Sequence, residues 1–401
     1  MSRRRALLAL EDGTVFKGTS FGAQGTTTGE ICFNTAMAGY QEVLTDPSYH
    51  GQIVTMTAPQ IGNTGVNNAD DQSRRPRVAG FVVRDAEEPH SSWRAEGSLL
   101  DYLTRHGVIG IADVDTRRLA RRIRTSGAMR AALTTEITDV SAAVELAASS
   151  PSLVGRDLAI EVTTPSPYGW DEDTLERRSE PGYAAGRERA PATRELLEET
   201  TGDRARVAAL DFGLKHNILD LLVAGGCDVT VFPATTDSDE LLAGNFDGIF
   251  LSNGPGDPEP VTYGIETVRS LLGRIPIFGI CLGHQILALA LGGRTYKLPF
   301  GHRGGNHPVR RLDHERVEIT CQNHGFAVDA ASIETTAARV THVNLNDGTV
   351  EGIELPGLAF SVQYHPESGP GPHDSRYLFT KFRRLMTEFE PRPADRALEA
   401  L

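Results

Sequence analysis

Cysteine is scarce in this chain, which has only Cys32, Cys227, Cys281 and Cys321 among 401 residues. No two of them form a CxxC pair, so the sequence favours neither a zinc site nor a disulfide framework. Few, unpaired cysteines are typical of a reducing compartment, where a single thiolate can do chemistry. We therefore expect a cytoplasmic protein.

Long apolar runs are absent as well, and so is an excess of positive charge. No stretch approaches the roughly 20 apolar residues that a membrane-spanning helix needs. The N-terminal MSRRRALLAL has a basic start but only five apolar residues before Glu11, which is too short for a signal peptide. With 40 basic and 53 acidic residues the net charge is −13, which argues against a nucleic-acid binder. Neither a membrane nor a nucleic acid is expected as a partner.

The length of the chain predicts two domains, and the first half is predicted to be a mixed α/β domain. Residues 6–10 and 14–18 flank the tripeptide EDG, which is a signal for a β-hairpin. Further apolar segments predict strands and one helix, at residues 29–35, 52–57 and 79–83 for the strands and 99–106 for the helix.

An arginine-rich segment follows at residues 113–124, DVDTRRLARRIR. Asp115 or Thr116 can cap a helix here, and five arginines surround an apolar face formed by Leu119 and Ile123 at i, i+4 spacing. Such a helix fits either a phosphate- or nucleic-acid-binding patch or a solvated, partner-facing surface. The acidic total of the chain favours the second interpretation.

The composition changes at residues 166–205, which are charged and hold few apolar residues. They are predicted to be a linker, with a short helix at residues 193–200. Strands and helices then alternate, with strands expected at residues 207–212, 227–232, 246–251 and 275–279 and helices at 215–223, 237–243 and 265–272. This alternation is typical of a mostly parallel sheet covered on both faces, whose ligands bind beyond the carboxyl ends of the strands. The predicted domains are therefore residues 1–165 and 206–390, joined by the linker at 166–205.

The strongest local signal is the stretch IPIFGICLGHQILALALGG, residues 275–293. A short apolar strand ends at Gly279, Cys281 follows, and apolar residues recur at helical spacing from Gly283 onward. A cysteine at a strand-to-helix turn, with a glycine two residues to each side, has the pattern of a nucleophile elbow. The glycines relieve crowding at so sharp a turn, and the positive end of the helix dipole favours the thiolate. Cys281 is therefore a candidate nucleophile rather than an inert buried cysteine.

A thiolate nucleophile needs a base, and the base needs a group that orients it. The candidate base is His365, at the end of a strand predicted at residues 360–364, which Pro366 should end. Glu367 lies two residues on and is placed to accept the other imidazole N–H. A histidine can also be purely structural, but the strand-end position together with the cysteine elbow favours catalysis.

Together, FGICLGHQ and QYHPE resemble the class I (triad) glutamine amidotransferases over roughly the C-terminal half of the chain. The N-terminal half is similar to the N-terminal domain of carbamoyl-phosphate synthase small subunits, in GEICFNTAMAGYQEVLTDPSYHGQIVTMTAPQIGNTGVN and GIADVDTRRLARRIRTSGAMRAAL. The resemblance is nearly full length. It implies an α/β protein with an N-terminal mixed α/β domain and a C-terminal class I glutamine amidotransferase domain on a mostly parallel sheet.

The resemblance also implies which residues form the site. The catalytic residues would be Cys281, His365 and Glu367, and the backbone N–H groups of Gly256 and Leu282 would stabilise an oxyanion. The residues implied to bind L-glutamine are Ser48, Gly254, Gly256, Leu282, Gln285, Asn323, Gly325 and Phe326.

Three segments near this site have a plainer interpretation from the residues alone. The loop SNGPGDP, residues 252–258, indicates a turn and is not a Walker loop, because the Gly-Lys-Ser/Thr ending is missing. QNHGF, residues 322–326, is by itself a turn between strands at 317–320 and 326–328. GHRGGNHPV, residues 301–309, holds two histidines, but its glycines and lack of carboxylates favour a loop leading into a strand over a metal site.

The implied reaction is hydrolysis of glutamine through a cysteinyl thioester, with the ammonia delivered to a separate large subunit. That subunit would use the ammonia and ATP-activated bicarbonate to make carbamoyl phosphate for arginine and pyrimidine synthesis. The implied partners are thus L-glutamine and the carbamoyl-phosphate synthase large subunit; ATP and Mg are used there, and this chain holds no cofactor or metal.

Two alternatives are open. One is the glutaminase component of another synthetase, such as those that make anthranilate or guanylate, against which the N-terminal half argues. The other is a non-catalytic scaffold, against which the intact Cys281, His365 and Glu367 argue.

Overall fold

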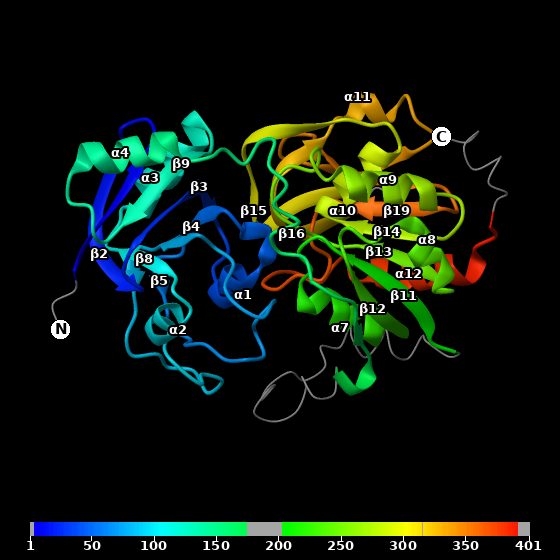
Figure 1. Ribbon diagram of the computed structural model, residues 1–401, viewed down its shortest axis with the longest axis horizontal. Coiled ribbons are helices and arrows are strands. Elements are labelled where there is room, and N and C mark those ends of the chain that lie inside the picture. The colour runs from blue at the N-terminus through cyan, green and yellow to red at the C-terminus, as the bar shows by residue number, and fades with distance from the viewer. Residues whose placement is uncertain (1–3, 175–202, 315, 392–401) are drawn as a thin grey trace. The chain divides into compact units, whose positions relative to one another are not determined.

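The computed structural model describes residues 4–174, 203–314 and 316–391. These residues divide into two compact units, whose elements are labelled in Figure 1. The first unit holds residues 4–156 and 299–304, and the second holds residues 157–174, 203–298 and 305–391 except for 315. Most of the predicted linker, including the helix expected at residues 193–200, lies outside the described residues.

The first unit is built on a closed β-barrel. Its strands are β1 (Arg5–Leu10), β2 (Val15–Gly22), β3 (Thr26–Asn34), β4 (Gln52–Met56), β6 (Gly80–Val82), β8 (Ile109–Ala112) and β9 (Met129–Thr134). They follow the order β1-β2-β8-β6-β4-β3-β9, and β9 closes the ring by pairing with β1. Fully buried apolar side chains from these strands, such as Leu8, Ile31 and Leu133, pack in one cluster. The strands predicted for this half are confirmed, and the barrel joins them.

Helices and short turns surround this barrel. They are α1 (Tyr40–Thr45), the 3₁₀ turn η1 (Pro47–Tyr49), α2 (Leu99–Arg105), α3 (Thr116–Ser126) and α4 (Val140–Ser149), with a small ribbon of β5 (Gln60–Ile61) and β7 (Asp85–Ala86). The arginine-rich helix α3 begins as predicted, because the Asp115 side chain accepts the Arg118 N–H at 2.9 Å. Leu119 and Ile123 are fully buried, so the apolar face of α3 is also confirmed.

The second unit is built on a ten-stranded sheet. Its strands are β10 (Tyr168–Trp170), β11 (Ala205–Asp211), β12 (Cys227–Pro233), β13 (Gly248–Leu251), β14 (Ile277–Ile280), β15 (Thr295–Arg311), β16 (Val317–Val328), β17 (Arg339–Asn344), β18 (Val350–Leu355) and β19 (Ala359–Val362). The order is β10-β12-β11-β13-β14-β19-β18-β17-β15-β16. Five neighbouring strands, β12, β11, β13, β14 and β19, are parallel, which confirms the parallel sheet predicted from the alternation. Beyond β19 the strands β18, β17 and β15 pair antiparallel and extend the sheet.

Helices cover both faces of the parallel strands (Figure 1). They are α7 (His216–Ala224), α8 (Ser238–Ala243), α9 (Thr262–Leu271), α10 (Leu282–Ala290), α11 (Ala330–Ile333) and α12 (Tyr377–Glu388). Ile249 and Leu251 of β13 pack in one cluster with α9 and α10, whereas Phe250 between them packs in another with α7 and α12. Both faces are apolar because the sheet is buried on both sides. Within the described residues, no helix has the length and apolar character that crossing a membrane requires.

Three segments differ from the local interpretation of the sequence. QNHGF forms no turn, because β16 runs unbroken from residue 317 to residue 328. The glycine-rich segment 301–309 lies inside the long strand β15 rather than in a loop. Tyr168–Trp170, which lie near the start of the predicted linker at 166–205, form the edge strand β10 on β12. In these places hydrogen bonding to neighbouring strands outweighs the local preference of glycine and polar residues for turns. The predicted domain boundaries remain predictions.

Candidate active site

Cys281 lies at the turn between β14 and α10, where the elbow pattern predicts it. It follows the last residue of β14 directly and caps α10, with φ 56° and ψ −103°. A positive φ is rare for a residue with a side chain and is typical of strained functional positions. The Cys281 N–H donates to the Val362 carbonyl at 2.9 Å, and Sγ lies 3.6 Å from the Asn323 carbonyl oxygen. The thiol is therefore held at the carboxyl end of the parallel strand β14.

The two glycines that flank Cys281 are required by close backbone contacts. A Cβ atom on Gly279 would lie 2.7 Å from the carbonyl oxygen of Gly283. A Cβ atom on Gly283 would lie 2.3 Å from the carbonyl oxygen of Leu251, at the end of β13. Since neither distance is open to a real side chain, the predicted reason for these glycines is confirmed.

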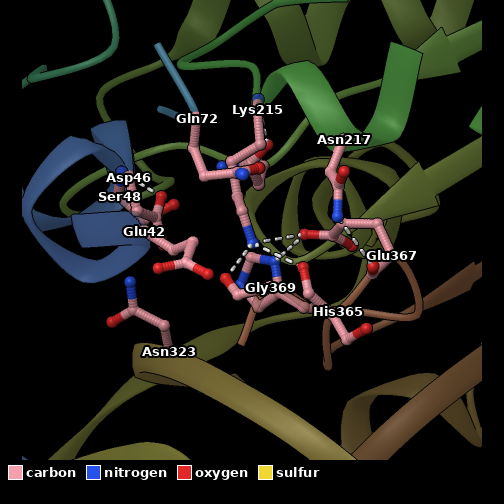
Figure 2. A network of polar contacts seen from close by, with 12 residues as sticks. Glu42, Asp46, Ser48, Gln72, Lys215, Asn217, Asn323, His365, Glu367 and Gly369 are labelled. Carbon is pink, nitrogen blue, oxygen red and sulfur yellow. Dashed lines mark hydrogen bonds and ion pairs between the residues drawn. The ribbon is translucent and has the colours of Figure 1, made fainter. Parts of the chain in front are cut away.

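His365 and Glu367 form a buried pair, drawn in Figure 2. Nδ1 of His365 lies 2.7 Å from Oε1 of Glu367. His365 lies three residues beyond the end of β19, the strand that pairs in parallel with β14. Cys281 and His365 therefore both leave the sheet at the carboxyl ends of neighbouring strands, where such sheets bind ligands. The other ring nitrogen, Nε2, is buried and has no hydrogen-bond partner among the residues that the structure describes.

A third charged residue, Lys215, joins this pair, and sequence reasoning missed it. Its Nζ lies 2.9 Å from Oε1 of Glu367 and 3.2 Å from the carbonyl oxygen of Ser368 (Figure 2). The Lys215 side chain is only 2% exposed, and Asn217 donates from Nδ2 to the backbone carbonyl of Glu367 at 3.2 Å. The sequence contained no local signal for this contact, because Lys215 precedes α7 and Glu367 follows β19.

The charges of these groups determine their protonation. Burial alone would raise the pKa of Glu367, but Lys215 and His365 outweigh it and lower the pKa to about 2. Burial would lower the pKa of His365, but the charges of Glu367 and Cys281 raise it well above its usual value. At neutral pH the glutamate is therefore ionised and the histidine protonated. The charge of His365 thus interacts with Cys281, which joins the predicted nucleophile to the histidine–glutamate pair.

The loop of residues 252–258 is joined to the elbow. The Gly283 N–H donates to the Ser252 carbonyl at 3.0 Å. Gly254 packs so closely that a Cβ atom there would lie 2.6 Å from Cδ2 of Leu282, and Gly256 has a φ of +84°. Leu282 is the first residue of α10, so its N–H has no carbonyl partner within the helix. The two predicted oxyanion donors thus lie on adjoining segments.

Other predicted glutamine-binding residues of the second unit lie on α10 and β16. Gln285 lies one turn after Cys281 on α10, and its Nε2 donates to the Phe326 carbonyl at 2.9 Å. Asn323 reaches the cysteine through its backbone carbonyl, and Gly325 lies between Asn323 and Phe326 in β16. The structure therefore brings this part of β16 to the elbow.

Ser48 belongs to the first unit. It lies in η1, where its N–H donates to Oδ1 of Asp46 at 2.9 Å, and it is buried. Its role in binding glutamine stays a prediction.

Comparison with known families defines the class of this site. Residues 208–385 match the family described as glutamine amidotransferase class-I. The second unit, with its cysteine elbow and histidine–glutamate pair, is therefore of the class I glutamine amidotransferase type. Residues 8–133 match a second family, described as the carbamoyl-phosphate synthase small chain, CPSase domain.

Relatives over the full length define the family more narrowly. The chain is 55% identical over 384 residues to a carbamoyl phosphate synthase small chain of Syntrophotalea carbinolica, covering 95% of this chain and 98% of that protein. It is 50% identical to a protein of the same name from Rhodopirellula baltica, covering 96% of this chain and 97% of that protein. The chain belongs to the family of carbamoyl-phosphate synthase small chains.

Similar solved structures cover about half of the chain. One, described as a glutamine amidotransferase from Thermotoga maritima, covers 49% of this chain and 90% of that chain, with 18% identity and a TM-score of 0.35.

Proposed function

We propose that this chain hydrolyses L-glutamine and supplies the ammonia for the synthesis of carbamoyl phosphate. The observation that carries the proposal is the strained Cys281 turn beside the buried His365–Glu367 pair. The family of the chain supports the same conclusion, because its full-length relatives are named as small chains of carbamoyl phosphate synthase.

The first half of the reaction releases ammonia. The Cys281 thiolate attacks the side-chain amide carbon of glutamine, and the carbonyl electron pair moves to oxygen. The N–H groups of Gly256 and Leu282 stabilise this oxyanion. His365, which has already taken the thiol proton, gives it to the amide nitrogen as the C–N bond breaks. Glu367 keeps the imidazole oriented and favours its charged form.

The second half regenerates the cysteine. After ammonia has left, the γ-glutamyl group is bound to Sγ as a thioester. A water molecule gives a proton to the now neutral His365 and attacks the thioester carbon, and the C–S bond breaks. Glutamate leaves, and Cys281 and His365 return to their starting charges.

The synthetase chemistry is assigned to a partner chain. We assign the use of the ammonia, of bicarbonate and of ATP with Mg to a large subunit, whose product feeds arginine and pyrimidine synthesis. A reducing cytoplasm suits the complex, because a thiolate nucleophile is lost on oxidation.

The test is glutaminase activity of the purified chain, measured as glutamate and ammonia released, with and without the co-expressed large subunit. We expect activity that rises with the partner and is lost in Cys281→Ser, because serine has no comparable anion at neutral pH. Activity that survives in Cys281→Ser would show that Cys281 is not the nucleophile. A wild-type chain that is inactive both with and without the large subunit would favour a scaffold.

A matched control is Cys227→Ala. Cys227 is buried in the core on β12, and burial raises the pKa of its thiol to about 12. We expect this variant to keep wild-type activity, which separates the loss of a nucleophile from the loss of any buried thiol.

A further inference from the structure

A chain of three amide groups runs from the backbone of β16 through α10 to the end of β19. Gln285 Nε2 donates one hydrogen bond to the Phe326 carbonyl at 2.9 Å and a second to Oε1 of Gln363 at 3.0 Å. Gln285 is 2% exposed and Gln363 is fully buried. Gln363 has so far no role in the site, although it lies two residues before His365.

The direction of this chain is fixed at one end. A carboxamide can rotate and exchange its oxygen and nitrogen, but the backbone carbonyl of Phe326 can only accept a hydrogen bond. Gln285 must therefore direct its NH₂ group toward Phe326. The second hydrogen of that group then points to Gln363, which must present its oxygen, since a rotated Gln363 would place two donors against each other.

The amide of Gln363 is held in an orientation that destabilises the fold, which supports the direction of these hydrogen bonds. Its own Nε2 is buried and has no hydrogen-bond partner among the described residues. A buried donor without a partner is destabilising. The hydrogen bond from Gln285 to its oxygen keeps Gln363 in this orientation although its nitrogen has no partner. The contact therefore orients Gln285 at the expense of stability.

One atom of Gln285 is left to bind something else. Both of its N–H groups are used, whereas its Oε1 makes no hydrogen bond to the described residues. Oε1 is an acceptor only, so its partner must be a donor. Gln285 lies one turn after Cys281, and its N–H donates to the Cys281 carbonyl at 3.2 Å, which places it beside the nucleophile.

We infer that Gln363 is a positioning residue which holds Gln285 with its oxygen toward the α-ammonium of the bound glutamine. This inference rests on the proposed function. Free glutamine has three polar groups: its carboxamide lies at Cys281 to react, and its carboxylate can only accept. The ammonium is the donor that remains, and a hydrogen bond to a charged group is among the stronger ones. Gln363 thereby contributes to selecting an α-amino acid over an amide without the amino group.

The test compares two substrates, L-glutamine and 4-carbamoylbutanoate, which lacks the α-amino group. The complex with the large subunit is assayed with wild-type chain, Gln363→Met and Gln363→Glu. Met has no acceptor comparable to the amide oxygen, whereas Glu, ionised or protonated, still offers one to Gln285.

For Gln363→Met we expect a roughly tenfold rise in KM for L-glutamine, the size of one charge-assisted hydrogen bond partly lost, with little change in kcat. KM for 4-carbamoylbutanoate should stay the same, so the preference for glutamine falls by the same factor. Gln363→Glu should restore most of that preference. General destabilisation would affect both substrates alike and would leave the ratio unchanged.

Gln363→Asn is the second variant, in case Met perturbs folding. It keeps a buried amide but is one methylene too short to reach Gln285, so we expect the same loss of preference. An active complex whose substrate preference is unchanged in both Met and Asn variants would overturn the role of Gln363 and leave the proposed function standing. A wild-type complex without glutaminase activity would overturn both.

Discussion

Among single residues, Lys215 decides the charge of the histidine–glutamate pair. It is the largest of the influences that lower the pKa of Glu367, which burial alone would raise. A buried cation beside a buried carboxylate keeps the carboxylate ionised, and the ionised carboxylate keeps His365 protonated. Lys215 therefore affects Cys281 indirectly, through Glu367 and then His365.

Replacing Lys215 by Met is expected to shift the pH profile of glutaminase activity. Without the cation, burial raises the pKa of Glu367, so the carboxylate is protonated at a higher pH. We expect the acidic limb of kcat/KM to move to higher pH, measured by initial rates across the acidic range. An unchanged acidic limb would show that another group controls the charge of Glu367. Lys381→Met is a control, since this lysine of the second unit pairs with Glu354 instead.

The ion pair between Lys215 and Glu367 also predicts how the stability of the chain depends on pH and on mutation. The pKa of Glu367 in the folded chain, about 2, is lower than its ordinary value of 4.5, so its stabilising contribution is present above about pH 4.5 and is lost as pH falls toward 2. Near neutral pH, Lys215→Met and Glu367→Gln should each lower the free energy of unfolding by about 3–5 kcal/mol, because each removes one partner of the buried Lys215–Glu367 ion pair. The double variant should lose less free energy of unfolding than the sum of the losses in the two single variants.

Denaturant titration of the four proteins measures this coupling, and repeating it at acidic pH should reduce the coupling as Glu367 takes up its proton. Additive effects at neutral pH would contradict a buried ion pair.

At the scale of elements, the elbow depends on how closely β13, β14 and α10 approach one another. Leu251 ends β13, and its carbonyl leaves no room for a side chain at Gly283 in the first turn of α10. The N–H of Gly283 also donates to Ser252, so the same contact fixes the loop that carries Gly254 and Gly256. The position of the predicted oxyanion donors therefore follows from the absence of one Cβ atom.

We expect Gly283→Ala to lower the free energy of unfolding by about 1–3 kcal/mol, because α10 must move away from β13. The displacement also moves the N–H of Leu282, so kcat for glutamine should fall more than stability alone explains. The control is Gly169→Ala on β10, where a Cβ atom meets nothing within 4 Å and a change within about 0.5 kcal/mol is expected. Thermal unfolding and steady-state kinetics measure the two effects. A wild-type kcat in Gly283→Ala would show that catalysis does not require the close contact at Gly283.

At the scale of the whole molecule, each unit has buried clusters of its own. The cluster around Phe278 joins β13, β14 and β19 to α12, with ring centroids 4.5 Å apart between Phe278 and Phe360 and 5.3 Å apart between Phe278 and Phe250. The barrel of the first unit has separate clusters, one of which contains the fully buried Phe81.

We therefore expect Phe278→Ala to destabilise the second unit by about 3–5 kcal/mol, through the cavity that it leaves. Hydrogen–deuterium exchange should rise in β11, β13 and β14 and stay near wild type in β1 to β4. Phe81→Ala is the reciprocal control and should raise exchange in the barrel strands. Equal increases in both units from either variant would show that they unfold as one.

The sequence by itself determined the features that depend on neighbouring residues. The helical spacing after Gly283, the glycines around Cys281 and the cap at Asp115 are local, and the structure has each where predicted. The parallel strands also followed from sequence, because alternation of strands and helices leaves few other ways to bury both faces. His365 and Glu367 were found because they lie only two positions apart in the chain.

The tertiary structure alone decided what depends on residues far apart in the chain. Lys215 meets Glu367, and Gln363 meets Gln285, only once the sheet has formed. The pairing of β9 with β1 closes the barrel, and β16 continues through QNHGF because neighbouring strands supply hydrogen bonds that a local pattern cannot show. Local preferences are worth about 1 kcal/mol per residue or less, so such long-range contacts outweigh them.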